Sequence, residues 1–406
     1  MKKTIQSKRD AGYLLGPVFY EFCCRLYWAA ASYSPEKDAL LFMARGGLRL
    51  QELFKVFLAS NGLQCPVACH PFWISRFAAL KMTLEESPEF SYSRLVNEFS
   101  YTNCRTLASA LLPEELFPEK QRILDELPEE IAQAGVNREN VLRLLYESGK
   151  YSEIVQQHFK EQHDLGHRYL QNTFGKYERL HTVDSGWFGS TLGSLQTGCR
   201  QWRWDALYFG RWNYKNEVPW YFHDITGLII DAEGLRGTKP VDVFLEYHHI
   251  LEAALEPEIP SVEYYLPEDR CNAMIPDWEK AVTGTEQDDL WSGILDYLKE
   301  PHSLKLNDAA KETCRVMKIW KRLLRYPTKE EALLLEVPPR SADFGKKDCT
   351  AVFPETSGGC GCTYWRNMKR SLWPAGAIAI HSGFSRRWKQ MFWHFARKIT
   401  GYKGAV

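Results

Sequence analysis

Two short glycine-rich segments hold the residue types that bind phosphate. Residues 44–48 (ARGGL) follow an apolar run, and residues 183–192 (VDSGWFGSTL) continue a second apolar run with an acid, hydroxyl side chains and glycines. Backbone amides in a glycine-rich turn that leads into a helix bind anions, because the unpaired N–H groups and the helix dipole both favour negative charge. Two such loops on one sheet predict a substrate with two phosphate groups.

The two segments resemble the loops of a known enzyme class. Residues 44–48 resemble the pyrophosphate loop of type I phosphoribosyltransferases, and residues 183–192 resemble their loop for the ribose and 5-phosphate of phosphoribosyl pyrophosphate (PRPP). The usual second loop has two adjacent acids and then Asp-Thr-Gly-x-Thr. Here Asp184 is the single acid, Val183 stands at the first acidic position, and Trp187 stands at the usual catalytic aspartate position.

More of the chain resembles a transferase family of bacterial capsule and O-antigen clusters, often beside or fused to a haloacid-dehalogenase-type phosphatase. The segments that carry this resemblance span nearly the whole chain: residues 12–17 (GYLLGP), 41–47, 74–76 (ISR), 183–191 and 373–376 (WPAG). The resemblance implies a transferase that moves ribofuranose 5-phosphate from PRPP onto a glycan acceptor of the growing polysaccharide and releases pyrophosphate, with a lipid-linked glycan as one form of that acceptor. It leaves the 5-phosphate to a separate phosphatase partner.

Within this resemblance the first loop is expected to neutralise the pyrophosphate. Arg45 would act with the backbone amides of Gly46 and Gly47, because an arginine fork makes bidentate phosphate contacts that lysine cannot make. An arginine that only caps a strand-to-helix turn is the structural alternative. Charge must be held at both ends of the breaking bond, since the transition state has oxocarbenium character.

Asp184 is the acid expected to act at the ribose. It ends an apolar strand in the sequence pattern, where a carboxylate must be paired, hydrated or metal-bound. We expect it to contact the ribose hydroxyls or a hydrated Mg²⁺, the expected cofactor, and helix N-capping is the alternative. Asp184 and Arg45 are therefore the expected catalytic residues.

The rest of the second loop is expected to hold the 5-phosphate. Gly186 would allow unusual torsions or a close backbone approach. Trp187 and Phe188 either offer a stacking surface to a sugar acceptor or pack against inserted helices. The residues whose hydroxyls and amides would bind the phosphate are Ser185, Gly189, Ser190 and Thr191, the last two opening the next helix.

Three further side chains are candidates for the site. Arg76 follows an expected strand and is placed to reach a phosphate, or else to form a salt bridge with an acidic insertion. Glu246 and Glu252 are expected on one helix with His248 and His249 between them, and either acid could be a general base for an acceptor hydroxyl. The same spacing would allow a metal to bind between His249 and Glu252, and a solvated helix face is the alternative.

Composition limits the partners and the compartment. The chain holds 51 basic and 51 acidic residues, but from Thr363 onward there are nine Lys or Arg and no acid. Eleven cysteines, an odd count, without an apolar signal segment favour a reducing cytoplasm. Cys360 and Cys362, with Cys349 upstream, lack a second ligand pair at zinc spacing, so free thiols are expected. No apolar run approaches the roughly 18 residues that a spanning helix requires.

The basic tail mixes cations and aromatic residues at helical spacing. One stripe of residues 384–399 holds Trp388, Phe392, Phe395 and Ile399. Such a helix can lie on an anionic membrane surface, dock onto the acidic remainder of the chain, or bind nucleic acid. We expect peripheral contact with the inner face of the cytoplasmic membrane, and no nucleic-acid partner.

Strand and helix patterns alternate in the way that gives a parallel, doubly wound α/β sheet. We therefore expect a type I phosphoribosyltransferase-like core over residues 11–240 with a helical insertion at about 84–175, a helical elaboration over 241–355, a hinge over 356–362 and a tail over 363–406. The expected strands cover residues 39–43, 67–74, 179–183, 204–210 and 225–231. The expected helices include residues 16–33, 241–255, 277–298 and 308–324.

Two other functions compete with the glycan transferase. One is a nucleobase or nucleotide-metabolism phosphoribosyltransferase, which would need neither the loop aromatics, nor the long insertion, nor the basic tail. The other is a non-enzymatic assembly protein that retains two phosphate loops as structure. Binding of PRPP, measured with and without Mg²⁺, separates the enzymes from the assembly protein.

Overall fold

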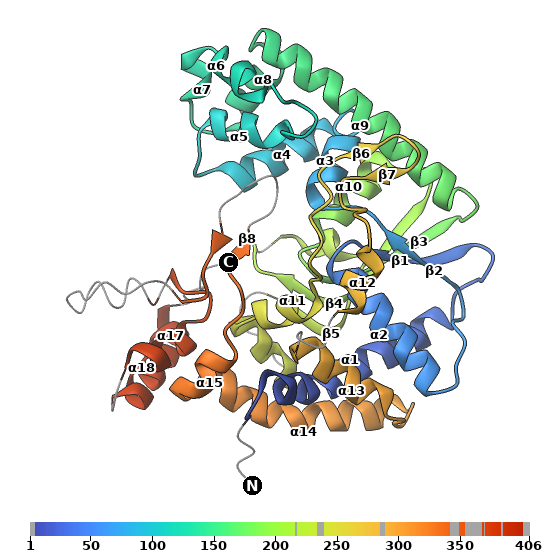
Figure 1. The fold of residues 1–406 in the computed structure, drawn as a ribbon, viewed down its shortest axis with the longest axis vertical. Coiled ribbons are helices and arrows are strands. Elements are labelled where there is room, and N and C mark those ends of the chain that lie inside the picture. The colour runs from blue at the N-terminus through green and yellow to red at the C-terminus, as the bar shows by residue number, and fades with distance from the viewer. Residues whose placement is uncertain are drawn as a thin grey trace.

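The core of the protein is a sheet of five parallel strands in the order β2-β1-β3-β4-β5. The computed structural model describes residues 5–215, 217–233, 239–284, 289–341, 349–353, 368, 370–382 and 385–400. The strands are β1 (Asp38–Met43), β2 (Ala68–Phe72), β3 (Arg179–Trp187), β4 (Arg203–Asn213) and β5 (Ile225–Glu233). Helices lie on both faces of the sheet (Figure 1), so the expected α/β class with a helix-flanked parallel sheet is confirmed.

Both faces of the central strands are apolar, as buried parallel strands require. Leu40 and Phe42 of β1 pack into one hydrophobic cluster, and Ala39, Leu41 and Met43 pack into another, because successive side chains point to opposite faces. The helices on the first face are α1 (Lys8–Ala30), α2 (Gly46–Ser60), α13 (Asp289–Lys299) and α14 (Leu306–Arg325). Those on the second face are α3 (Arg76–Thr83), α9 (Lys150–Phe174) and α10 (Ser190–Gly198).

A buried histidine ties three strands together near their amino ends. His181 of β3 is fully buried, and its two ring nitrogens lie 3.1 Å from Asp38 Oδ1 of β1 and 2.5 Å from Asp205 Oδ1 of β4. Tyr33 stacks on the imidazole at a centroid distance of 3.8 Å. Because these contacts fix the relative register of β1, β3 and β4, they also fix where the opposite ends of these strands lie.

The connection from β2 to β3 is long and helical. Between α3 and α9, helices with their own hydrophobic cluster form a body at one end of the molecule, opposite α1 and α14 (Figure 1). These helices are α4 (Pro88–Phe99), α5 (Cys104–Leu111), α6 (Lys120–Asp125), α7 (Glu129–Ala132) and α8 (Arg138–Tyr146). The insertion therefore reaches the sheet through α3 and α9 and adds a separate packed body beyond it.

Several short elements accompany β5, α13 and α14 in the described chain after β4. The remaining helices there are η1 (Pro219–Phe222), η2 (Pro240–Glu246), α11 (His249–Leu255), α12 (Trp278–Thr283), α15 (Lys329–Leu334), α17 (Pro374–His381) and the longer α18 (Arg386–Thr400). The small hairpins pair β6 (Tyr265–Leu266) with β7 (Arg270–Cys271), and β8 (Arg340–Ser341) with β9 (Cys349–Thr350). The hinge predicted over residues 356–362, with Cys360 and Cys362, lies outside the described residues.

Two predicted helices are wrong because each is broken. Residues 241–255 form the 3-10 helix η2 and then α11, with Tyr247 in a non-helical conformation between them (φ −155°, ψ 64°). Residues 277–298 contain α12 and α13, and α12 ends at Gly284, whose φ of 78° favours glycine. Glu246 and Glu252 therefore do not share a helix.

The first helix begins earlier than its apolar pattern predicts. It starts at Lys8 rather than Gly16, because Ser7 and Asp10 form a capping box at its amino end. Pro17 lies inside the helix, where its missing N–H removes one helical hydrogen bond. An apolar periodicity marks the buried face of a helix and does not by itself mark its ends.

Residues 12–17 serve helix packing. A Cβ added at Gly12 would lie 2.0 Å from the Leu290 carbonyl oxygen, and one added at Gly293 would lie 2.1 Å from the Arg9 carbonyl oxygen. A Cβ at Gly16 would lie 2.3 Å from the Tyr297 side chain. The backbones of α1 and α13 therefore cross in near contact, which only glycine allows at these positions.

We expect Gly12→Ala to destabilise the protein by about 1–3 kcal/mol, because its methyl group must push α13 away. Gly135→Ala is the matched control, since a Cβ there meets nothing within 4 Å. Chemical denaturation of both variants measures the free energy of unfolding. Equal stability of Gly12→Ala and Gly135→Ala would contradict the close crossing of α1 and α13.

Candidate functional site

The two glycine-rich segments meet at one edge of the sheet. β1 and β3 are parallel neighbours, with Phe42 paired to Val183, so their carboxyl ends lie together. The chain leaves β1 toward β2 and returns past β1 to β3, which makes this edge the topological switch point where ligands bind to open α/β sheets. The fold therefore brings residues 44–48 and 183–192 to the place expected for a ligand.

The contact between the segments depends on the glycine pair. A Cβ at Gly47 would lie 2.6 Å from the Val183 carbonyl oxygen, and one at Gly46 would lie 3.2 Å from Asp184 Oδ1 and 3.3 Å from Ser185 Oγ. The first turn of α2 therefore rests directly on Asp184 and Ser185. A side chain at Gly47 would separate the two segments.

Both segments contain strained backbone. Arg45 has a φ of 68° and Trp187 a φ of 83°, in the region that L-residues rarely adopt. Gly186 and Gly189 also have positive φ, at 96° and 80°. Because such conformations cost about 1–3 kcal/mol for a non-glycine residue and gather at functional sites, this observed strain favours a functional role for the edge.

β3 is longer than the sequence pattern predicts. It was expected to end at Asp184, but its pairing with β4 continues to Trp187, opposite Arg211. A Cβ at Gly186 would lie 2.5 Å from the Gly210 carbonyl oxygen, so this glycine lets the strand continue beside β4 with an irregular backbone. The connection to α10 is consequently short, and α10 begins at Ser190, with Gly189 as its N-cap in a left-handed conformation.

The carboxyl group of Asp184 has a pKa well above that of an ordinary aspartate. Burial raises its pKa to about 7, while the backbone N–H groups of Ser185 and Gly186 favour the carboxylate and the charge of Glu256 opposes it. The positive charge of Arg45 lowers the pKa by a smaller amount. A carboxyl group that titrates near neutral pH can both accept and release a proton during a reaction.

The two arginines singled out from the sequence each face an acid. Arg45 forms an ion pair with Glu256, whose Oε1 lies 3.2 Å from Nη2, and both side chains are about one quarter exposed. Arg76, at the start of α3, forms an ion pair with Glu98 of the insertion at 3.6 Å. Ser75 caps α3 by accepting hydrogen bonds from two backbone N–H groups. Arg45 thus lies at the Asp184 edge, and Arg76 lies where α3 meets α4.

Of the two predicted acceptor bases, Glu252 lies at the second loop and Glu246 does not. Trp187 Nε1 donates to Glu252 Oε1 at 2.9 Å, and His249 Nδ1 lies 2.9 Å from Glu252 Oε2. Glu246 instead accepts from Arg325 Nε at 2.9 Å. Glu252 is therefore placed by Trp187, whereas Glu246 ties η2 to the end of α14.

Trp187 and Phe188 are both buried, at 9 % and 4 % exposure. The Trp187 ring packs over Gly210 and meets His248 edge to face, with centroids 5.5 Å apart. Phe188 lies among aromatic rings of the cluster on the other face of the sheet, and its ring centroid is 5.2 Å from that of Tyr214. Packing therefore accounts for both rings, and they face opposite sides of the sheet.

Three groups of carboxylate or imidazole side chains are candidate cation sites. Asp184 and Glu256 act on each other electrostatically, and the raised pKa of Asp184 indicates a carboxylate that would gain from a nearby cation. Oxygen ligands of this kind fit a hydrated Mg²⁺ that is completed by substrate phosphates. The imidazole groupings in the described part of the chain are His248–His249–Glu252 and Glu86–His163–His167.

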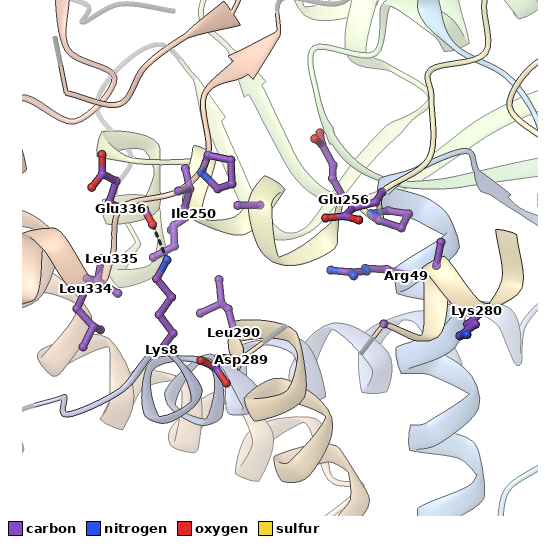
Figure 2. Close-up of a pocket in the computed structure, with 17 residues that line it drawn as sticks. Lys8, Arg49, Ile250, Glu256, Lys280, Asp289, Leu290, Leu334, Leu335 and Glu336 are labelled. Carbon is purple, nitrogen blue, oxygen red and sulfur yellow. Dashed lines mark hydrogen bonds between the residues drawn. The ribbon is translucent and has the colours of Figure 1, made fainter. Parts of the chain in front are cut away.

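A cavity of about 690 Å³ lies next to the loop edge (Figure 2). Glu256 joins the two, because it pairs with Arg45 and also lines the cavity. Figure 2 shows Arg49 beside Glu256 on one side and Lys8 with Glu336 on the other, where Lys8 Nζ donates to the Glu336 carbonyl oxygen at 3.0 Å. The volume lies within the range of small-molecule sites.

Comparisons with models of known protein families and with curated proteins find no match to this chain.

Sequence reasoning missed two residues of this region. Glu256 was not singled out, because its partner Arg45 lies 211 positions earlier in the chain. Arg49 lies four positions after Arg45, in the first turn of α2, and this closeness in the sequence was the available signal that it lies near the same loop. Arg49 is buried, donates to the Ala254 carbonyl oxygen at 2.9 Å, and lies over Trp291 at 4.7 Å.

We expect the raised pKa of Asp184 to make the protein less stable as pH rises. Between about pH 4 and 7 the folded chain keeps a proton on Asp184 that the unfolded chain has released, so the free energy of unfolding falls over this range. Asp184→Asn should remove this contribution and gain stability relative to the native chain between pH 5 and pH 8. Thermal unfolding at both pH values measures it, with the exposed Asp164→Asn as control. Parallel pH profiles for Asp184→Asn and the native chain would contradict the raised pKa.

Proposed function

We propose that the protein transfers ribofuranose 5-phosphate from PRPP to a hydroxyl group of a glycan acceptor and releases pyrophosphate. The observation that carries this proposal is the juxtaposition of Arg45, the glycine pair and Asp184 at the switch point of a parallel sheet. One edge thus holds two glycine-rich segments of the kind that can bind phosphate, and the Asp184 carboxyl group of the second segment lies next to Gly46 of the first. The resemblance of both segments to phosphoribosyltransferase loops agrees with this arrangement.

The first segment would hold the leaving group. A pyrophosphate that enters beside Gly46 and Gly47 would take over Arg45 from Glu256, because its charge is higher and it can accept both N–H groups of the fork. Mg²⁺ held by Glu256 and the substrate phosphates would supply further charge neutralisation to the pyrophosphate and would leave the Asp184 carboxylate able to take a proton. Such preorganised groups stabilise charge that develops in the transition state.

The transfer step balances with the groups at this edge. The bond between C1 of the ribose and the pyrophosphate oxygen breaks, and its electron pair leaves with the pyrophosphate. The acceptor oxygen forms the new bond to C1, and its proton passes to a carboxylate. Asp184, with a pKa near 7, has the properties of such a base. Glu252 would act mainly by holding Trp187 in place.

The cavity beside Glu256 would receive the acceptor. It combines charged groups with apolar surface from Ile250 and Leu290, and such mixtures suit saccharides, which have polar edges and apolar faces. In this arrangement the acceptor hydroxyl approaches from the Glu256 side while PRPP lies over the two loops. The product keeps its 5-phosphate, and a separate phosphatase would remove it.

The structure of α18 bears on where this reaction would occur. Gln390 Nε2 donates to the carbonyl oxygens of Pro327 and Ala375, both at 3.2 Å, and Trp393 is buried, so one side of the helix docks onto the protein. The predicted stripe lies on the other side: Trp388, Phe392 and Phe395 are 75 %, 57 % and 62 % exposed. The side chain of Ile399 lies outside the described residues.

This exposed stripe supports peripheral contact with a membrane. Arg386, Arg387 and Lys389 lie on the same helix, and a helix with aromatic residues and cations binds at the interface of anionic bilayers. None of the helices in the described ranges is long and apolar enough to cross a bilayer. A lipid-linked acceptor would then be presented at the surface where α18 binds.

We expect Arg45→Ala and Asp184→Ala each to reduce transfer by about 30- to 1000-fold, the usual loss when a charge-stabilising group is removed from a transition state. The assay incubates the protein with PRPP, Mg²⁺ and synthetic lipid-linked glycans, and mass spectrometry looks for a gain of one ribose phosphate. Arg105→Ala is the control, since Arg105 pairs with Asp125 in the insertion, within the α5–α6 region.

The transfer assay, together with calorimetry of PRPP binding, separates the competing functions. Calorimetry that shows no PRPP binding, with or without Mg²⁺, would leave the assembly protein as the better interpretation. Transfer to a nucleobase rather than a glycan would favour nucleotide metabolism. Unphosphorylated ribose on the acceptor, formed by the purified protein alone, would contradict the retained 5-phosphate.

We expect the triple variant Trp388→Ala, Phe392→Ala, Phe395→Ala to lose most of its flotation with anionic vesicles, because it removes the apolar stripe while keeping the cations. Each remaining cation contributes on the order of 1 kcal/mol near an anionic surface, and this contribution fades with salt. Residual flotation should therefore disappear at high salt. Tyr101→Ala, at a fully exposed aromatic residue of the insertion, is the control. Native-like flotation of the triple variant at high salt would rule out the stripe as the membrane contact.

A further inference from the structure

A buried arginine of the insertion lies beside the second glycine loop. Arg94 of α4 is only 8 % exposed, and its Nε and Nη1 atoms are buried without a hydrogen-bond partner in the described part of the chain. A guanidinium group carries five donors, and leaving them unmatched in the interior is costly. The structure thus holds a cation for which the described residues offer no acceptor at two of its nitrogens.

The surroundings of Arg94 place it at the amino end of α10. Its Cζ atom lies 5.5 Å from the ring of Phe188, which precedes the N-cap Gly189, and 4.8 Å from the ring of Phe90. Phe90 in turn packs on α10, because a Cβ at Gly193 would lie 2.7 Å from its ring. Arg94 is therefore enclosed between α4 and the turn that opens α10.

A second buried polar atom lies in the same region. Arg94 Cζ is 5.6 Å from the ring of Tyr221, whose hydroxyl is buried close to the Ser190 side chain without a hydrogen bond of normal geometry in the described residues. Lys215 adds another cation, 4.8 Å from the Phe188 ring. The hydrogen-bond donors of Arg94, Tyr221 and the first amides of α10 therefore lie in one small region.

We propose that Arg94 belongs to the subsite that the sequence assigns to a phosphate monoester at the amino end of α10, and that it is the principal charged contact of this subsite. The unpartnered nitrogens of Arg94 would donate to the phosphate together with the amino end of α10 and the hydroxyls of Ser190 and Tyr221. Helix amides and an arginine fork are the donors that a phosphate dianion prefers. The inference rests on the proposed function and deepens it, because the monoester it assigns to this subsite is the 5-phosphate of PRPP.

The subsite would divide recognition of PRPP between two parts of the chain. Arg45 with the glycine pair would bind the pyrophosphate at the end of β1, and Arg94 would bind the monoester at the start of α10. The insertion is then a functional part of the donor site, because α4 supplies this arginine. A ligand that lacks a monoester would bind without Arg94.

Calorimetry with pyrophosphate, ribose 5-phosphate and PRPP tests this division. We expect Arg94→Met to weaken binding of ribose 5-phosphate and PRPP by about 10- to 100-fold, the usual effect of losing hydrogen bonds to a charged group, and to leave pyrophosphate binding unchanged. Arg94→Lys should recover part of the affinity, because it restores the charge without the fork. Arg138→Met is the matched control, since Arg138 is an exposed insertion arginine paired with Glu89.

Thermal unfolding without ligand distinguishes binding from structure. Removal of a cation with unmatched donors should keep or raise the unfolding temperature, whereas loss of a structural arginine would lower it. Ribose 5-phosphate affinity that is equal in Arg94→Met and the native chain overturns the subsite, as does a uniform loss of all three ligands with a lowered unfolding temperature. If the native chain binds none of the three ligands, the proposed function itself fails.

Discussion

The close contact between the start of α2 and the end of β3 is the constraint on which the site depends. A hypothetical Cβ at Gly47 would approach the Val183 carbonyl oxygen to 2.6 Å, so the helix can sit this close only because the residue has no side chain. The contact holds Arg45 in a strained conformation beside Asp184. At the other end of the same strands, His181 bridges Asp38 and Asp205 and fixes their register. Specific contacts therefore fix the strands at both ends. The positive φ values of Arg45 and Trp187 lie at the carboxyl end.

Electrostatics at this edge are balanced for a ligand of higher charge. Asp184, Glu256 and Arg45 lie together, and the excess of acid over base combines with burial to raise the pKa of Asp184. Without a ligand the arrangement is self-neutralising, because Arg45 pairs with Glu256 and Asp184 can hold a proton. A phosphate-rich donor, bound with a divalent cation, would exchange these partners rather than add unpaired charge. This is why one carboxylate in the second loop is compatible with the proposed chemistry.

The sequence predicted what depends on local pattern and missed what depends on packing between distant segments. Apolar runs located the strands, and the glycine pair and Ser190 located the starts of α2 and α10. The break between η2 and α11 was not predicted, because the apolar spacing continues across Tyr247, whose ring stacks on Trp373 of a segment more than a hundred positions later. Glu256 and Arg94 were missed for the same reason. Their roles arise from contacts with residues between 94 and 211 positions away in the chain.

The two glycine-rich loops do not by themselves decide the function, because residues of the insertion and of other segments surround them. On the proposed function, residues 44–48 and 183–192 would bind phosphate, but the side chains that lie against them come from other segments. α3 and α4 bring Arg76, Glu98 and Arg94 toward the amino end of α10, and α11 brings Glu252 and Glu256 toward Trp187 and Arg45. On this proposal the sheet would supply anion binding in general, and the elements packed on its edge would decide which phosphate is bound at which end and where an acceptor enters. Specificity would then depend on the segments that sequence patterns describe least well.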